Sequence, residues 1–275
     1  MPIMGMTELL RALSLEHHLE VAMLGLPRLT ILLSLTPFLG GAGLLSGQIK
    51  LPIILAIYFF IHPVLLEQFP EGTEFLAHEN AFVVGGLMLK EAFLGFLLAY
   101  LSSLAFWAVQ SAGFLMDNQR GASQANVSDP LSGEESSPLG AFLFQSFVFL
   151  FFASGAFLSF LFLIFQTYVF WPPGEWLPSP DAQLPLFVAS MVSWLMTKVL
   201  LLAGIVLVAS LLVDLALGLI NRFASQLNVY ILAMPIKSGL TMLIVLIFFP
   251  FFIGDSPGLF EEMMNAILSL RRIWS

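Results

Sequence analysis

The 275-residue sequence contains no cysteine and few charged residues. The absence of cysteine excludes disulfide bonds and thiolate metal sites. Only 10% of the residues are charged, whereas soluble domains carry about 25%. Because 59% of the residues are hydrophobic and gather in long runs, the sequence excludes a soluble globular protein. The runs are continuous rather than alternating, which also excludes a transmembrane β-barrel.

The sequence also lacks the short motifs of familiar enzymes. It has no zinc-protease motif, no serine-hydrolase elbow and no phosphate-binding loop of the Walker type. Its histidines are too scattered for a metal site, apart from the adjacent pair His17 and His18, for which a surface or interfacial role is favoured. The net charge of −8 and the lack of a basic stripe disfavour nucleic acid. We therefore expect no enzyme activity, no cofactor, no metal and no nucleic-acid partner.

What the sequence does contain is a series of long apolar blocks. They lie at about residues 21–38, 51–66, 81–116, 139–170, 184–213 and 229–253. Blocks of this length are typical of helices that cross a membrane. The sequence therefore predicts an all-α polytopic membrane protein, built of long helices and helical hairpins. We expect residues 1–275 to form a single membrane domain, because no polar stretch is long enough to bury a core of its own.

Three of these blocks, 81–116, 139–170 and 184–213, exceed the roughly 20 residues that one helical crossing needs. They form either long tilted helices or hairpins. The candidate break points are the glycines inside them: Gly95, Gly113, Gly155 and Gly204. The block 139–170 also holds eleven of the 28 phenylalanines, which favours packing against lipid and other helices over lining a pore.

The C-terminal segment, residues 257–274, has a different pattern. Phe260, Met263, Ile267 and Leu270 recur at helical spacing, with acidic and basic residues between them. Pro257 suits the first position of such a helix. The pattern predicts an amphipathic helix, which lies on the bilayer surface or binds a partner.

Several charged residues interrupt the apolar blocks. Arg28, Lys90, Glu91 and Lys198 all lie at positions where an unpaired charge costs several kcal/mol. Because neighbouring residues on a helix do not face each other, we expect Lys90 and Glu91 to have different partners. These charges are explained by ion pairs between helices or by a wet, ion-coupled passage. The second explanation fits a secondary transporter or permease, although no inverted repeat is found.

Two polar, turn-rich segments, residues 113–140 and 221–240, lie between the blocks. In the first, Asp117 and Arg120 are three residues apart, so they can pair at a helix end or belong to a loop that plugs a lumen. In the second, Lys237 needs a carboxylate partner, for which this chain offers Glu91 and Asp214 and a neighbouring subunit is an equal alternative. Polar segments at membrane depth are buried in protein or line a wet cavity, which indicates a part of a larger assembly.

Several separate motifs resemble one family. They are Glu91 and the segments 113–121, 129–134, 137–140, 226–229 and 234–237. In their order and spacing, over about residues 20–255, they resemble the T-subunit family of the type III secretion export apparatus, SctT, whose flagellar relative is FliR. The stretch 168–172 resembles the injectisome branch more than the flagellar one. One departure is Ser225, where the family commonly has proline.

The resemblance implies a single-copy subunit of an export gate in the bacterial inner membrane, with the assembled core raised toward the periplasm. The implied partners are the small R-type and S-type subunits, the U-type switch subunit, the large V-type subunit, unfolded proteins in transit and membrane lipid. Helices arranged as hairpins are a further implication. It also implies that the segment around Asp117 helps to close the conduit.

The site residues that follow fall into three groups. The pore plug implied by the resemblance comprises Phe114, Leu115, Met116, Asp117, Asn118, Gln119 and Arg120. Gly113 and Gly121 flank it, either as hinges or as points of close helix packing. The residues expected to carry intramembrane charge or to contact other subunits are Lys90, Glu91, Lys198, Gln226, Asn228, Pro235 and Lys237.

Overall fold

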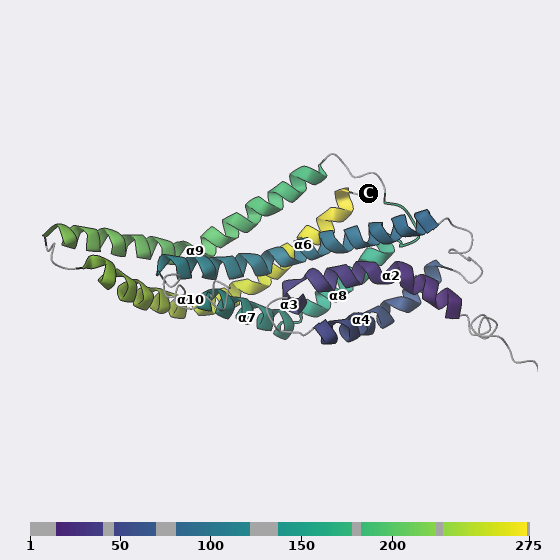
Figure 1. The fold of residues 1–275 in the computed structure, drawn as a ribbon, viewed down its shortest axis with the longest axis horizontal. Helices are drawn as coiled ribbons and strands as arrows, with labels where there is room; N and C mark the ends of the chain where they lie inside the picture. The colour runs from purple at the N-terminus through teal and green to yellow at the C-terminus, as the bar shows by residue number, and fades with distance from the viewer. Residues whose placement is uncertain are drawn as a thin grey trace, which may run out of the picture. The chain divides into compact units, whose positions relative to one another are not determined.

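A computed structural model describes residues 15–40, 47–69, 81–121, 137–177, 183–223 and 228–273 (Figure 1). Over these residues the regular elements are all helices, which confirms the predicted all-α class. In chain order they are α2 (Leu15–Leu35), α3 (Pro37–Gly40), α4 (Gly47–Gln68), α6 (Ala81–Gln119), α7 (Pro138–Ala153), α8 (Ala156–Phe170), α9 (Leu184–Phe223) and α10 (Val229–Ile273).

The described helices are long and apolar enough for a multi-pass membrane protein. Five of them qualify as membrane spans by length and composition within the described residues, namely α2, α4, α6, α9 and α10. The pair α7 and α8 would form a sixth span, which is bent by 72° between the two helices. The chain is therefore a multi-pass helical membrane protein.

Of the three long apolar blocks, two lie in continuous helices and one is divided into two helices. α6 runs through Gly95 and Gly113 without a break, and α9 runs through Gly204, so these three predicted break points are wrong. Gly155 does separate α7 from α8 and has a φ of +78°, a conformation that glycine adopts without strain. The break predicted there is confirmed.

At Gly95 and Gly113 the missing side chain permits close packing instead of a break. A Cβ added to Gly95 would lie 2.5 Å from the carbonyl oxygen of Arg28, and one added to Gly113 would lie 2.5 Å from the Cα of Gly140. Such distances are shorter than any van der Waals contact, so both glycines let another helix approach the backbone of α6. Nothing lies within 4 Å of a Cβ added to Gly204, where the helix simply continues.

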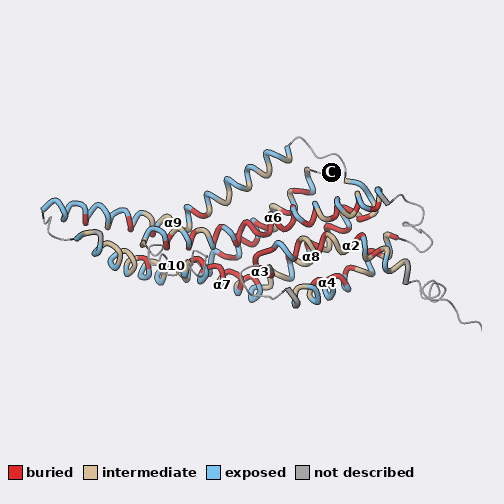
Figure 2. The backbone as a smooth tube through the Cα atoms, viewed as in Figure 1, coloured by how far each residue is buried: buried red, intermediate tan, exposed pale blue. Residues whose placement is uncertain are grey.

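Contacts divide the chain into two compact units. The first comprises residues 1–103, 158–184 and 264–275, and the second comprises residues 104–157 and 185–263. In the first unit α2 packs against α4, and Leu24, Leu29, Leu32 and Leu33 of α2 are buried. Figure 2 shows buried residues in both helices. The single membrane domain expected from the sequence stays a prediction.

The core of the second unit is rich in phenylalanine. The ring of Phe106 on α6 makes edge contacts with Phe147 and Phe151 on α7, at centroid distances of 5.0 and 5.3 Å. Both α7 rings also contact Phe260 on α10, at 4.6 and 5.2 Å. Offset and edge contacts of this kind stabilise aromatic pairs beyond their buried area. These phenylalanines of the block 139–170 therefore serve helix packing.

The C-terminal segment is not a separate helix. α10 includes Pro235, Pro250 and Pro257, so the predicted start at Pro257 is wrong. Around Pro257 the side chains of Ser256, Leu259 and Phe260 are buried, and this packing outweighs the backbone hydrogen bond that proline cannot donate. Met263, Ile267 and Leu270 are buried as well. Its placement on the bilayer surface or against a partner stays a prediction.

Candidate functional site

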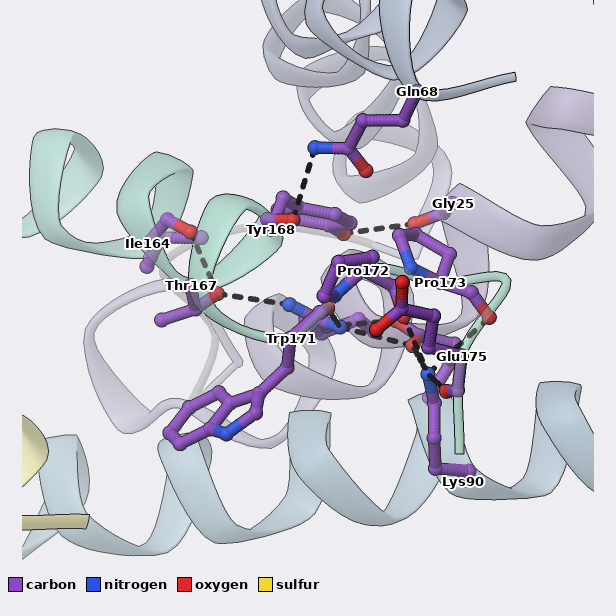
Figure 3. Close-up of polar contacts among 12 residues, drawn as sticks. Gly25, Gln68, Lys90, Ile164, Thr167, Tyr168, Trp171, Pro172, Pro173 and Glu175 are labelled. Atoms are coloured by element: carbon purple, nitrogen blue, oxygen red, sulfur yellow. Dashed lines mark hydrogen bonds and ion pairs between the residues drawn. The ribbon is translucent and has the colours of Figure 1, made fainter. Parts of the chain in front are cut away.

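The first polar site is a buried ion cluster in the first unit, centred on Arg28 of α2. Figure 3 labels Lys90, Thr167 and Trp171 among the residues of this site. Its guanidinium donates from Nε and Nη2 to both carboxylate oxygens of Glu91 on α6, at 2.7 and 2.9 Å. It also donates to the Thr167 hydroxyl and the Trp171 carbonyl, and its Cζ lies 4.2 Å from the centroid of the Tyr168 ring. Both charged side chains are 0% exposed, and all three guanidinium nitrogens of Arg28 have partners.

Lys90 completes the cluster by binding the turn that follows α8. Its Nζ donates to three carbonyl oxygens of that turn, at 2.9, 3.2 and 2.8 Å: those of Pro172, Pro173 and Glu175. The same Nζ lies 2.6 Å from a carboxylate oxygen of Glu91. The expectation that Lys90 and Glu91 have different partners is therefore wrong in part, because the long lysine side chain curves toward the carboxylate that Arg28 already binds. Two cations share one carboxylate, and carbonyl oxygens satisfy the remaining N–H groups.

Sequence reasoning missed the partners of this cluster. Thr167 and the turn 171–175 supply its hydrogen-bond acceptors, yet the sequence marks the turn only by its Pro-Pro-Gly run. Gly174 in this turn lies against the ring of Phe69, where an added Cβ would be 2.8 Å from a ring carbon. The arrangement fits the structural explanation of the buried charges, since every charged group has its partners within the unit.

The second polar site joins the end of α6 to the start of α7, in the second unit. One carboxylate oxygen of Asp117 accepts hydrogen bonds from Arg120, whose Nε lies at 2.7 Å. The other accepts from the Ser137 hydroxyl at 2.6 Å and from the backbone N–H of Leu139 at 2.8 Å. Ser137 in turn caps α7 by accepting from the N–H of Gly140. Asp117 and Arg120 therefore pair at a helix end, which is one of the two predicted arrangements.

This join fixes which members of the predicted plug reach the surface. Met116 and Asp117 are buried within the unit. The exposed or half-buried members are Phe114, Leu115, Asn118, Gln119 and Arg120. The plug segment therefore occupies the last turns of α6 and the turn after it, and the described residues leave only one of its faces uncovered.

The flanking glycines differ from each other. Gly113 lies inside α6, where its contact with Gly140 fits the close-packing alternative. Gly121 follows the helix with a φ of +83°, which favours glycine at a helix end. Their role as hinges stays a prediction. The continuation of the polar segment, residues 122–136, lies outside the described residues.

The third polar site consists of two ion pairs on α9 and α10. Lys198 lies 2.8 Å from Glu262, which also accepts a hydrogen bond from the indole of Trp194 at 2.6 Å. Lys237 lies 2.6 Å from Asp214, so Asp214 rather than Glu91 is its partner within this chain. The carboxylates are 43% and 47% exposed, in contrast to the buried Glu91.

The remaining predicted contact residues lie near the start of α10. Asn228 is exposed, and its carbonyl accepts a hydrogen bond from the N–H of Ile231 at 3.1 Å. Pro235 is an exposed residue inside α10. Gln226 lies outside the described residues. Within the described part of the chain, no group of three or more metal-ligating side chains is found.

Comparison with known proteins identifies the family. The model of the family described as bacterial export proteins, family 1, matches residues 19–263. The chain is 37% identical over 210 residues to Yop proteins translocation protein T of Yersinia pestis, which covers 76% of each protein. It is 31% identical over 217 residues to the secretion system apparatus protein SsaT of Salmonella typhimurium, covering 79% of this chain and 82% of that protein.

The flagellar relatives are less similar. Flagellar biosynthetic protein FliR of Escherichia coli is 26% identical over 243 residues, covering 88% of this chain and 89% of FliR. The higher identity to the two secretion-system proteins favours the injectisome branch. The chain therefore belongs to the bacterial export protein family 1, the SctT and FliR family of export-apparatus membrane proteins.

Proposed function

We propose that this chain is a single-copy subunit of the type III secretion export gate, and that it helps to form and close an inner-membrane conduit for unfolded proteins. Its relatives bear names of protein translocation, secretion-system apparatus and flagellar biosynthesis. The observation that carries the proposal is the contrast between α6 and the pair α9 and α10. In the most apolar stretch of α6, 72% of the residues are buried, against 22% in α9 and 6% in α10.

The ion pairs on α9 and α10 indicate what covers these helices. A charged pair that faced lipid would cost several kcal/mol, so such groups normally face protein or water. Glu262 and Asp214 are nearly half exposed, and each has a lysine partner that is also partly exposed. We infer that neighbouring subunits or a wet lumen cover this surface. The R-type and S-type subunits are the partners we expect there, with the U-type and V-type subunits joining the assembled core.

The plug is the second part of the proposal. Phe114 and Leu115 offer apolar surface that can seal a narrow passage against ions, since apolar constrictions exclude water. Asp117, through Ser137 and Leu139, ties this segment to α7 and so holds it in place. We propose that the closed conduit is sealed by the exposed face of residues 114–120.

Assembly is the first test. The chain is co-expressed with candidate R-type and S-type subunits, purified in mild detergent and weighed by native mass spectrometry. We expect one copy of this chain in a defined complex with several copies of the small subunits. A stable monomer or homodimer that ignores those subunits would refute the gate proposal and favour the secondary transporter or permease.

The seal is tested in the same complex after reconstitution into vesicles. Phe114→Ala and Leu115→Ala together are expected to raise ion permeability, while Gln110→Ala, at an exposed position of α6 outside the plug, serves as the surface control. Removing residues 115–119 altogether is a poor test, because it also removes Asp117 and its contacts to α7. Unchanged permeability in the double variant would refute the plug assignment and leave the assembly proposal intact.

A further inference from the structure

Two histidines and a tyrosine connect α2 to α4 in the first unit, and none of the sites above uses them. His18 Nδ1 lies 2.9 Å from His62 Nε2, and His62 Nδ1 lies 2.8 Å from the hydroxyl oxygen of Tyr58. The histidine ring centroids are 5.1 Å apart. The helices approach closely beside this contact, since a Cβ added to Gly25 would lie 3.0 Å from the Tyr58 ring and 2.5 Å from the Leu65 side chain.

The number of protons on the pair decides whether this contact can exist. Two ring nitrogens 2.9 Å apart need one hydrogen between them, so one nitrogen donates and the other accepts. The neutral pair satisfies this condition, and so does the pair with one added proton. When both rings are imidazolium, hydrogens occupy both facing nitrogens, and two positive charges face each other. The contact between His18 and His62 is then lost.

Among the described residues, the neighbours of the pair that bond to it or act on it are not carboxylates. The titratable groups that act on His62 are His18 and His17 on the facing helix α2, with Tyr58 bonded to it from its own helix α4. Within the described part of the chain, no carboxylate forms a hydrogen bond or an ion pair with either histidine of the pair. Among the residues that the structure describes, a doubly protonated pair therefore has no bonded carboxylate to offset its two charges.

We propose that His18, His62 and Tyr58 form a proton-responsive latch between α2 and α4. The latch is closed while the histidine pair carries at most one added proton, and it opens when both rings are protonated. Histidine ordinarily titrates near pH 6.5, so the mildly acidic range is the one in which opening is tested. The ligand of this site is the proton.

Opening is expected to be local. After His18, the remainder of α2 is held in place by buried leucines and by the bonds from Arg28 to Glu91. The Tyr168 hydroxyl also donates a hydrogen bond to the Gly25 carbonyl at 2.8 Å. These contacts do not involve a histidine. Protonation therefore separates the ends of α2 and α4 that carry the latch, while the ion cluster stays intact. The inference does not depend on the export function of the chain.

The test uses the natural absence of cysteine. Leu19→Cys and Phe59→Cys place spin labels on exposed positions beside His18 and Tyr58, in the full chain reconstituted into lipid vesicles. The distance between the labels is measured by pulsed electron paramagnetic resonance from about pH 8 to about pH 5, across the ordinary range of histidine titration. We expect one short distance at the higher pH, and at least half of the molecules at longer distances at the lower pH.

Matched variants assign the response. His62→Gln keeps a polar side chain but takes up no proton, so the short distance should persist at both ends of the pH range. His17→Gln should retain a pH-dependent response, because His17 makes no hydrogen bond among the described residues and acts on His62 only through its charge. If His62→Gln prevents folding, His18→Gln replaces it. A label distance that ignores pH in the otherwise natural chain, or a response that survives in His62→Gln or His18→Gln, would overturn the proposal.

Discussion

The charged groups of the two units are satisfied in different ways. In the first unit, Arg28, Lys90 and Glu91 are almost fully buried, and their hydrogen bonds all end on side chains or carbonyls of the same unit. In the second unit, the pairs on α9 and α10 are partly exposed, and this chain hardly covers the most apolar stretches of these two helices (Figure 2). The first arrangement is complete in the single chain, whereas the second requires a neighbour or water.

Because of this difference, we expect variants in the first unit to change the stability of the chain and variants in the second unit to change its assembly into a complex. Breaking a buried ion pair leaves an uncompensated charge and strongly destabilises a fold, whereas exposed pairs contribute little. Variants of the ion cluster should therefore damage the chain itself. Variants on α9 and α10 should leave the chain folded and damage its complex. The following variants test this distinction, in order of decreasing effect on the isolated chain.

The largest effect is expected from Glu91→Leu. It leaves Arg28 and Lys90 buried without a carboxylate, which costs about 3–5 kcal/mol. The measurements are the amount of folded chain in the membrane and its thermal denaturation in detergent. Glu67→Gln, an exposed position on α4, is the control and should behave as the natural chain. Adding Arg28→Met to Glu91→Leu should recover part of the loss, and a denaturation midpoint equal to that of the control would show that the cluster does not stabilise the unit.

Gly113→Ala is expected to have the next largest effect. The new methyl group would lie 2.5 Å from the Cα of Gly140, and overpacking of this kind costs about 1–3 kcal/mol. The matched variant Gly204→Ala has no atom within 4 Å of the new methyl group, and replacing a helix glycine by alanine stabilises by about 0.5–1 kcal/mol. The two denaturation midpoints should therefore move in opposite directions. Equal shifts would argue against the close packing of α6 on α7.

Asp117→Asn should have a moderate effect. The variant weakens the charge-assisted bonds to Arg120, Ser137 and the N–H of Leu139, for a loss of about 1–2 kcal/mol. Denaturation of the isolated chain measures this loss, and ion flux through the reconstituted complex measures the seal. Gln110→Ala, at an exposed position of α6 outside the plug, should change neither quantity. A natural midpoint together with a leak would mean that Asp117 acts on the seal without stabilising the join.

The smallest effect on the isolated chain is expected from Glu262→Gln. It removes a partly exposed pair with Lys198, which is worth at most about 1 kcal/mol by itself. If neighbouring subunits cover this surface, the same variant should lower the yield of the complex far more than it lowers the stability of the chain. Glu261→Gln, one position away and exposed, is the control for both measurements. A complex that forms normally with Glu262→Gln would place this pair outside the subunit contacts.

The sequence predicted some local features well and others poorly. The break at Gly155 was predicted because a glycine interrupts a block too long for one crossing, and the structure has a sharp bend there. Gly95 and Gly113 gave the same local signal, yet both lie inside a continuous helix against another backbone. A glycine in an apolar block permits either outcome, and only the neighbouring segment selects between them.

Local sequence patterns could not predict the partners of the buried charged residues. Lys90 and Glu91 are adjacent, so the helix rule assigned them different directions, and their actual meeting depends on a turn more than 80 residues away. Arg28 finds its partners 63 and 139 residues along the chain, at Glu91 and Thr167. By contrast, the pairing of Asp117 with Arg120 is local, and the sequence already offered it as one of two alternatives.

Composition, apolar runs and motifs were sufficient to predict the membrane class, the helical composition and the family of this protein. The free energy of transferring a helix into lipid depends on the composition and length of that segment alone, so it can be judged from the sequence. The tertiary structure decided which glycines bend and which pack, which charges are completed within the chain, and which face of residues 114–120 is free. These outcomes depend on distances between segments far apart in the chain, where close packing and charge pairing outweigh local preference.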